Sequence, residues 1–314
     1  MFTAMTGARA RLVLVAAAVA LVATACWAPS FTAGTYDVAV TSNIVYGQGE
    51  VGGGGTFADL HLDLYTPQGT GQTELPLVVV VHGGGFVSGS KTQQNVIDWA
   101  HGFAERGYLV ASIDYRLAGS NPVPSDRVLP LYDAVASTDG TAQQVAAVAA
   151  IDDTLTALDY LVARPDTVDH LTTLVGGSAG AITVDYVAYA LDDVGIERPA
   201  VAAVVSNWGG FPFGSAAEFI QNPPLDTDTG YREPPIFMAH ATGDATVPYS
   251  LSTDIATQAT AVGLRHELYT KHGNVHSFDL TATQYEPGVS VLDAQISFVT
   301  CALYPHLGAT PECS

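Results

Sequence analysis

A serine that could act as a nucleophile stands at Ser178, in the run Leu-Val-Gly-Gly-Ser-Ala-Gly-Ala that covers residues 174–181. An apolar run precedes this Gly-x-Ser-x-Gly pattern and a helical run follows it. A nucleophilic serine at a sharp strand-to-helix turn has a strained backbone and needs small neighbours, which here are Gly176, Ala179 and Gly180. The free N–H groups at the start of the helix would also favour developing negative charge. The pattern therefore predicts covalent catalysis by Ser178, and its structural alternative is a simple glycine-rich turn.

A second motif is a run of glycines that could bind an oxyanion. His82, Gly83, Gly84 and Gly85 follow directly after a continuous apolar run. Acyl transfer needs backbone N–H donors aimed at the tetrahedral oxyanion. We predict that Gly83 and Gly84 supply two of them and that the N–H of Ala179 completes the hole. His82 is expected to brace this loop. Taken alone, the run could be a flexible loop.

At these two motifs the chain resembles the α/β-hydrolase superfamily. Within it, the chain is similar to the His-Gly-Gly-Gly branch of carboxylesterases, acetyl esterases and hormone-sensitive-lipase-like enzymes. The resemblance extends from residues 63–67 through 112–117 to motifs near the C-terminus, and so covers most of the chain. It implies a serine hydrolase with its catalytic residues in the order Ser, Asp, His, each after a successive strand. The implied two-step acyl transfer needs no cofactor.

The acid and the base follow from the same resemblance. The segment 240–248 is similar to the family's His-Gly-x-x-Asp-x-x-Val-Pro loop and assigns the acid to Asp244, for which a turn or helix-capping aspartate is the alternative. Segment 271–278 contains two histidines. His276 precedes a phenylalanine at the family's spacing and is the predicted base, with His272 as its rival.

The substrate pocket is harder to predict from sequence. Three aromatic side chains, Phe86, Trp208 and Phe213, are expected to contact the substrate. Segment 118–141 could form an insertion over the cleft. Segment 206–234 could be a lid lined with aromatic groups or a packed loop, and both alternatives stay open.

The elements that must position these residues alternate between apolar runs and helical runs. This alternation predicts a mostly parallel sheet of about eight strands with helices on both faces. Strands are expected at 77–81, 109–113, 171–175, 201–205, 236–239 and 266–270, and helices around residues 96–103, at 143–163 and 179–191, and near 250–263 and 289–302. The runs at 36–46 and 59–65 suit an antiparallel edge, and the second alternates strictly. We therefore predict one α/β-hydrolase catalytic domain over residues 36–314.

The composition and the residue spacing argue against a nucleic-acid partner and against a metal site. The chain has 314 residues, 48% of them hydrophobic, which is ample for a large core. Its 11 Lys and Arg against 31 Asp and Glu give a formal net charge of −20. Such a surface repels phosphate backbones, so no nucleic-acid partner is expected. The histidines show no His-x-x-x-His spacing and the cysteines no Cys-x-x-Cys spacing, so no metal site is expected either.

The N-terminus has the pattern of an export signal. Arg9 and Arg11 precede an apolar run from residue 12 to 23, which predicts a signal peptide over 1–25 and a linker over 26–35. The end of the run resembles the lipobox of bacterial lipoproteins, whose acylated residue would be Cys26. Secretion after simple cleavage and a transmembrane anchor are the alternatives. In an oxidising compartment Cys301 and Cys313 can close a C-terminal loop, which leaves Cys26 unpaired.

These observations predict an extracytoplasmic, lipid-anchored carboxylesterase. Its partner would be a small-molecule ester with a small or medium acyl group, including acetyl groups on carbohydrates, and its only membrane contact would be the N-terminal lipid. An amidase or peptidase on the same scaffold and a surface lipoprotein that has lost catalysis are the two other hypotheses. The sequence does not determine the oligomeric state.

Overall fold

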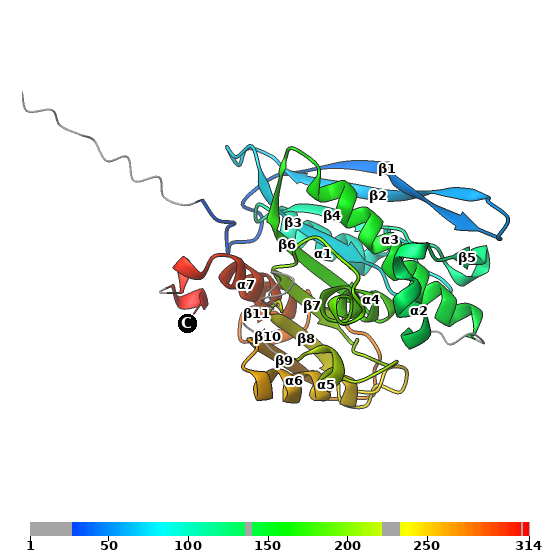
Figure 1. Cartoon of the computed structure of the whole chain (residues 1–314). Coiled ribbons are helices and arrows are strands. Elements are labelled where there is room, and N and C mark those ends of the chain that lie inside the picture. The colour runs from blue at the N-terminus through cyan, green and yellow to red at the C-terminus, as the bar shows by residue number, and fades with distance from the viewer. Residues whose placement is uncertain (1–26, 136–139, 222–232, 309, 314) are drawn as a thin grey trace, which may run out of the picture.

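The computed structural model describes residues 27–135, 140–221, 233–308 and 310–313. Its centre is a nine-stranded sheet in the order β5-β1-β2-β4-β3-β6-β7-β8-β9 (Figure 1). The strands are β1 Val38–Val51, β2 Phe57–Pro67, β3 Leu75–Val81, β4 Leu109–Ile113, β5 Pro122–Val123, β6 Thr167–Gly177, β7 Ala203–Asn207, β8 Ile236–Ala241 and β9 His266–Lys271. A separate two-stranded ribbon pairs β10 Gln284–Glu286 with β11 Val289–Ser290.

Helices connect the strands. The α-helices are α1 Gln94–Ala104, α2 Leu129–Val135, α3 Ala142–Val162, α4 Ala179–Tyr189, α5 Ala216–Phe219, α6 Ser250–Val262 and α7 Val291–Leu303. Short 3₁₀ turns cover Ala118–Ser120, Asp126–Val128, Asp192–Val194, Pro305–Leu307 and Pro311–Cys313.

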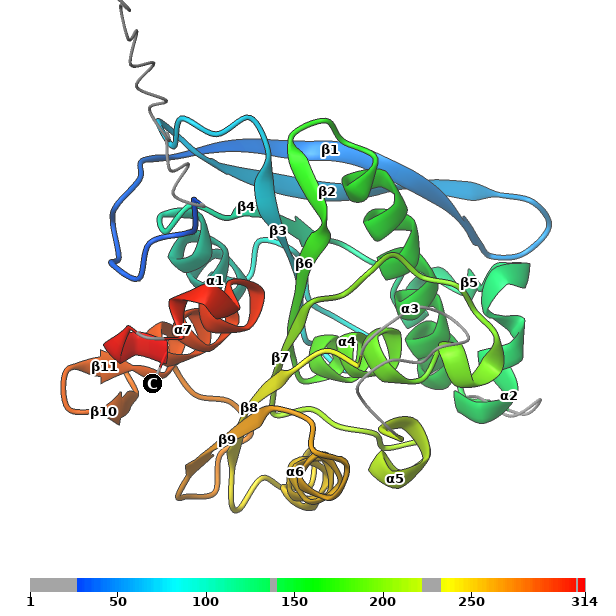
Figure 2. The same ribbon diagram turned by 60° about the vertical axis from the view of Figure 1, so that its left-hand side comes forward.

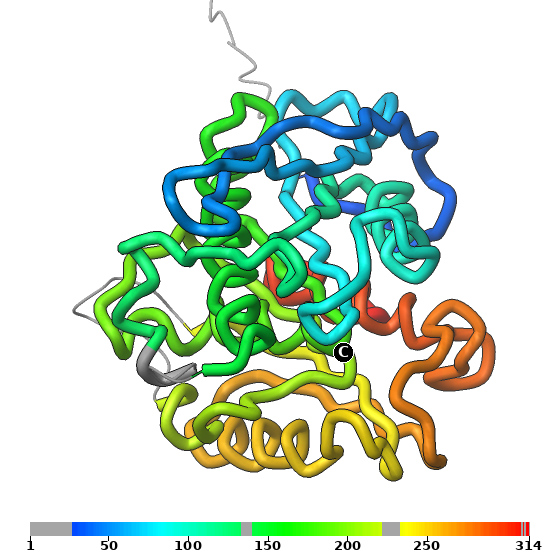
Figure 3. Tube along the Cα trace, turned by 90° about the vertical axis from the view of Figure 1, so that its right-hand side faces the viewer, coloured from blue at the N-terminus to red at the C-terminus, as the bar shows by residue number. Residues whose placement is uncertain are grey.

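Six strands of the sheet are parallel, and the N-terminal edge is antiparallel. β4, β3, β6, β7, β8 and β9 run in one direction, whereas β2 is antiparallel to β4 and β1 is antiparallel to β2. The predicted fold class is confirmed, and the extra strand is the two-residue β5, which pairs with the end of β1. Figure 3 shows the β1–β2 hairpin and α6 at opposite edges of the molecule.

Both faces of the parallel strands are covered, which explains their continuous apolar runs. Every residue of β3 is buried. Val78 and Val80 belong to a core cluster with residues of α1 and α7, whereas Leu77 and Val79 belong to a cluster with residues of α3, α4 and α6. Figure 2 shows the two groups of helices on opposite sides of the sheet.

The chain that precedes β1 is packed against the body. Trp27 packs against the core, and its ring lies 3.2 Å from where a Cβ on Gly107 would stand. The N–H of Ser30 donates to the Arg106 carbonyl at 2.7 Å, and the N–H of Tyr36 donates to the Glu105 carbonyl at 2.9 Å. The predicted linker 26–35 is therefore, from Trp27 onward, a docked part of the fold. The predicted signal peptide and Cys26 lie outside the described residues.

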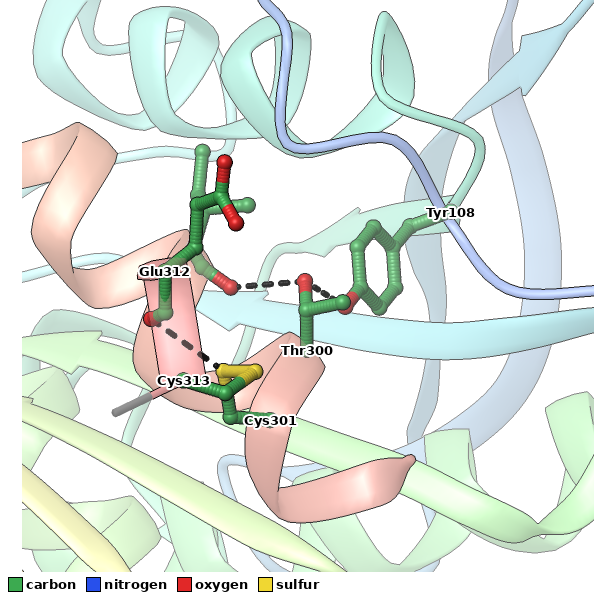
Figure 4. The surroundings of a disulfide bond; sticks show 6 residues. Tyr108, Thr300, Cys301, Glu312 and Cys313 are labelled. Carbon is green, nitrogen blue, oxygen red and sulfur yellow. Dashed lines mark hydrogen bonds between the residues drawn. A yellow bond between two sulfur atoms is a disulfide. The ribbon is translucent and has the colours of Figure 1, made fainter. Parts of the chain in front are cut away.

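The C-terminal end is held by a disulfide and by a hydrogen bond to the sheet. Cys301 of α7 is bonded to Cys313, the pair expected from the sequence (Figure 4). The next residue of α7 toward its N-terminus, Thr300, donates to the Ile296 carbonyl and accepts from the Tyr108 hydroxyl at 2.7 Å. Since Tyr108 directly precedes β4, this contact ties α7 to the sheet.

Candidate active site

Three predicted residues from three separate segments meet at the carboxyl ends of the parallel strands. The Nε2 of His276 lies 2.8 Å from the Ser178 Oγ, and its Nδ1 lies 2.7 Å from the Asp244 Oδ2. Ser178 follows β6, Asp244 follows β8 and His276 follows β9. The Asp244 carboxylate is fully buried, whereas the His276 side chain is 26% exposed. This chain of contacts can move a proton from the serine hydroxyl to the imidazole and hold the resulting cation.

The backbone at Ser178 is strained, and its neighbours must be small. Ser178 has φ 56° and ψ −122°, a conformation that costs energy for a residue with a side chain. A Cβ on Gly176 would stand 2.3 Å from the Gly180 carbonyl oxygen, and one on Gly180 would stand 2.1 Å from the Val81 carbonyl oxygen. A Cβ on Gly177 would stand 2.7 Å from the Trp99 ring. The sequence pattern indicated the first two requirements but not the third, because Trp99 comes from a distant helix.

The acid is oriented by several donors. The backbone N–H groups of Thr246 and Val247 donate to the Asp244 Oδ1 at 2.8 and 3.1 Å. Burial by itself would raise the pKa of Asp244, but these bonds and the one from His276 together hold that pKa below its ordinary value. Asp244 is therefore an anion at neutral pH, as the stabiliser of an imidazolium must be.

A second histidine supports the acid, and its role was not predicted. His240, at the end of β8, places its Nε2 3.2 Å from the Asp244 Oδ2 and 3.0 Å from the Val247 carbonyl oxygen. Its Nδ1 lies 2.7 Å from the Ser252 Oγ. Burial lowers the pKa of His240, so the ring is neutral and donates from Nε2. The motif contained this residue, but only the fold shows that its ring lies behind the acid.

The loop of the base is joined to the loop of the acid. The N–H of Gly243 donates to the Gly273 carbonyl at 2.9 Å, and the N–H of Thr242 donates to the Lys271 carbonyl at 2.9 Å. These bonds fix the distance between Asp244 and His276. The rival base His272 is exposed, and it is His276 whose ring lies within hydrogen-bond distance of the Ser178 Oγ.

The glycine run lies against the serine. A Cβ on Gly83 would stand 2.7 Å from the Gly177 carbonyl oxygen and 3.2 Å from the Ser178 Cβ. Gly84 has φ 120°, and a Cβ there would stand 1.9 Å from the Ser88 carbonyl oxygen, so this position requires glycine. Ala179 is the first residue of α4, and its N–H is beyond the reach of any carbonyl of that helix. The structure thus brings Gly83 and the start of α4 together at Ser178, and Gly84 lines the same pocket as the serine.

His82 braces this loop and is too buried to act as a base. Its Nδ1 donates to the Gly83 carbonyl at 2.7 Å, and its ring stacks on Tyr115 with 4.2 Å between the centroids. Burial lowers the pKa of His82. Because the C=O and N–H of one peptide point in opposite directions, the bond to the Gly83 carbonyl turns the Gly84 N–H away from the His82 ring.

A buried lysine anchors the end of the same loop, which the sequence analysis missed. The Lys91 Nζ lies 3.2 Å from the Asp63 Oδ1 and 3.0 Å from the Asn43 Oδ1. Its backbone N–H donates to the Asp114 Oδ1 at 2.7 Å. The Asp63 and Asp114 positions lie in the two segments of the family resemblance, and their role here is to hold the loop that carries the glycines.

Another buried carboxyl lies behind the pocket wall. Asp185 of α4 is fully buried and accepts a hydrogen bond of 2.8 Å from the Ser206 Oγ and one from the Gly210 N–H. Burial raises its pKa to about 8. Trp208 lies between Ser206 and Gly210, so Asp185 bonds to a side chain before this pocket residue and to the backbone after it.

A pocket of about 680 Å³ opens over Ser178 and His276. Its aromatic wall consists of Trp99, Trp208 and Phe278, and its remaining lining comes from the glycine loop, the start of α1, the nucleophile turn and the segment after His276. Of the three predicted substrate contacts, Trp208 lines this pocket, whereas Phe86 and Phe213 do not. The backbone of Phe86 has φ 63°, and its side chain turns into the core beside Tyr115.

The two segments predicted as lid elements do not cover this pocket in the described part of the chain. Of their described residues, Trp208 alone lines it. In segment 118–141, β5 pairs with β1 and α2 packs against α3. In segment 206–234, the residues before 222 pack against α4 and α6 through Phe211 and Phe219, and residues 222–232 lie outside the description.

The described residues contain no group of three or more His, Cys, Asp or Glu side chains that could hold a metal ion. Across the same ranges, none of the helices combines the length and the apolar character that crossing a membrane requires.

Comparisons with known proteins place this architecture among esterases. A family model described as BD-FAE matches residues 62–128, which include the glycine loop. Esterase 2 of the Planctomycetes species Thermogutta terrifontis, phosphorylated by paraoxon, is 19% identical with a TM-score of 0.57, and the match covers 86% of this chain and 93% of that one. Esterase B from Lactobacillus rhamnosis is 18% identical with a TM-score of 0.55, covering 89% of this chain and 90% of that one. The fold is therefore that of these esterases.

Proposed function

We propose that the protein is a serine carboxylesterase that hydrolyses small to medium acyl esters through an acyl-enzyme intermediate. The observation that carries the proposal is the continuous contact from the Ser178 Oγ through His276 to Asp244, with Gly83 beside the Ser178 Cβ and Ala179 at the start of α4.

The residues act in two half-reactions. His276 takes the proton of Ser178 while the oxygen attacks the ester carbonyl carbon, and the backbone donors bind the oxyanion. His276 then gives the proton to the leaving alcohol, and the C–O bond to the alcohol breaks. Water repeats these steps on the acyl-enzyme and releases the acid. Asp244 remains ionised and stabilises the imidazolium.

The ligands bound to the structurally similar esterases favour short acyl groups. Thermogutta terrifontis esterase 2 is described with butyrate and with propionate bound, and Lactobacillus rhamnosis esterase B is described as inhibited by a C4-C4 tributyrin phosphonate. By this likeness we expect acyl chains of similar length to be turned over here.

The test is labelling with a fluorophosphonate probe, followed by peptide mapping and a chain-length series of p-nitrophenyl esters. We expect label on Ser178 of the native protein, no label after heat denaturation or in His276→Ala, and no ester turnover in Ser178→Ala. Unchanged turnover in Ser178→Ala would overturn the proposal. Absence of label on a folded protein would favour a lipoprotein that has lost catalysis.

Matched ester and amide substrates distinguish an esterase from an amidase or peptidase on the same scaffold. The esterase proposal expects a much larger kcat/KM for an ester than for the amide with the same acyl group and a leaving group of similar size. A comparable or larger value for the amide would favour an amidase or peptidase.

Export and lipid anchoring remain proposals from the sequence. The expected mature protein begins with acylated Cys26 and partitions with membranes, and Cys26→Ala should release it into the medium. Mass spectrometry of the N-terminal peptide distinguishes this from simple secretion, in which the wild-type N-terminus carries no lipid.

A further inference from the structure

Charge is distributed unevenly around the pocket. Two carboxylates line it, Asp98 from α1 and Asp279 from the segment after His276, and the described lining residues include no Lys or Arg. Lys271 lies nearby, but its Nζ stands 5.2 Å from the centre of the Phe278 ring and the residue does not line the pocket. A ligand in this pocket therefore meets negative charge without a compensating cation from the wall.

In each of the two carboxylates, one oxygen accepts no hydrogen bond from a described residue. The Asp98 Oδ1 accepts from the Gln94 side chain at 2.8 Å. The Asp279 Oδ1 accepts from the Thr281 hydroxyl and N–H and from the Ala282 N–H. The donors at Thr281 and Ala282 lower the pKa of Asp279, so this group is ionised at neutral pH.

The aromatic wall supplies the second element of cation recognition. Trp208 is 3% exposed and lies 6.1 Å from Trp99 and 5.1 Å from Phe278 between ring centroids. Trp99 is 2% exposed, so Phe278, which is only partly buried, is the most accessible ring of this wall. Aromatic faces beside carboxylates suit alkylammonium groups, which need π surface and negative charge together.

The position of Asp279 indicates which part of the ester meets this charge. His276 must deliver its proton to the leaving alcohol, so the loop that carries His276 borders the alcohol side of the substrate. Asp279 lies three residues further along this loop. Asp98 directly precedes Trp99, whose ring contacts the nucleophile turn at Gly177.

Resting on the proposed esterase function, we propose that the pocket selects esters of cationic alcohols, and that Asp98 and Asp279 determine this preference. An ester of an amino alcohol or a quaternary ammonium alcohol would place its positive charge between the two carboxylates and the aromatic wall. An ester of an anionic alcohol would meet repulsion from both.

The experiment compares three acetate esters of similar size: acetylcholine, its uncharged isostere 3,3-dimethylbutyl acetate, and 3-acetoxypropanesulfonate. At low ionic strength we expect kcat/KM to be about tenfold higher for the cation than for the neutral ester and about tenfold lower for the anion, with both ratios shrinking as salt is added. Equal values for the cationic and neutral esters would overturn the proposal.

Variants distinguish the effect of the two pocket carboxylates from the effect of the protein's net charge. Asp98→Asn and Asp279→Asn each keep a hydrogen-bond acceptor, and each should reduce the ratio of kcat/KM for the cationic ester to kcat/KM for the neutral ester about threefold. Asp169→Asn removes the same charge from a side chain that is 75% exposed and far from the pocket lining. A preference that survives in the double variant, or that Asp169→Asn reduces equally, would refute the assignment.

The two proposals fail in different ways. If the neutral ester is not hydrolysed, or is hydrolysed equally by Ser178→Ala, the esterase function itself is wrong. If the neutral ester is hydrolysed through Ser178 and the charged esters show no preference, only the selection by Asp98 and Asp279 is wrong.

Discussion

Replacing Asp185 with asparagine should make the stability of the protein less dependent on pH. Asp185 is fully buried beside Ser206 and Gly210, and burial raises its pKa from 3.8 to about 8. Between these two values the folded protein holds a proton that the unfolded chain releases. Stability conferred by this proton is therefore fully present below about pH 4 and is lost as the pH rises towards 8.

The size of the effect follows from the difference in pKa. Each pKa unit corresponds to about 1.4 kcal/mol, so the wild-type protein should lose on the order of 3 kcal/mol from this group between pH 5 and pH 8. An asparagine cannot ionise and carries no such loss. It does place an amide donor where one Asp185 oxygen has no partner, and this adds a cost of about 1–3 kcal/mol that is independent of pH.

The assay is denaturant unfolding of the wild type and Asp185→Asn at pH 5, 7 and 8.5, with the difference in unfolding free energy plotted against pH. We expect Asp185→Asn to be less stable than the wild type at pH 5. The difference in unfolding free energy should shrink as the pH rises. The exposed Asp169→Asn serves as the control for a lost charge. A difference that stays flat from pH 5 to pH 8.5 would refute the argument that Asp185 is protonated in the fold.

Three further predictions concern the site. Asp244→Asn should lower kcat for an ester by about 10⁴-fold at neutral pH with little change in KM, because the imidazolium loses its counter-charge and its tautomer; a loss below tenfold would contradict this role. Gly177→Leu should lower kcat/KM by at least tenfold, since a Cβ there already stands 2.7 Å from the Trp99 ring, and Trp99→Ala in the same chain should restore part of the loss in steady-state assays. Lys91→Met should slow labelling by the fluorophosphonate probe several-fold and lower the unfolding midpoint, because it leaves the buried Asp63 without its ion-pair partner. An unchanged labelling rate would show that this ion pair does not position the glycine loop.

The regular part of the fold was predictable because burial sets its boundaries. β4 covers Leu109–Ile113, as expected, and lies within an apolar run from Tyr108 to Ile113 that Gly107 and Asp114 flank. β1 was expected at 36–46 but extends to Val51. Half of its 14 residues are exposed and two are buried, so backbone pairing with β2, rather than side-chain burial, determines where it ends.

The proximity of Ser178, the glycine loop and the candidate base was predictable for a different reason. Ser178 and the glycines occupy backbone conformations that restrict the sequence locally, so short motifs indicate them. The lining of the pocket depends on the direction of each side chain, which no motif encodes. Phe86 belongs to the predicted glycine loop, yet its positive φ turns the ring into the core, whereas Asp98 reaches the pocket from α1 without any sequence signal.

The docked N-terminal segment has a consequence for orientation at a surface. Trp27 lies at the end of α1 near Gly107, whereas the pocket is lined by residues 93–95, 98 and 99 at the start of that helix. The 11 residues of α1 span roughly 16 Å, and they separate the two regions. If residue 26 carries a lipid anchor, the membrane lies against the amino ends of the parallel strands and the mouth of the pocket faces the surrounding medium. Such an enzyme would meet esters that arrive by diffusion from outside the cell, and a long inserted spacer before Trp27 would remove this fixed orientation.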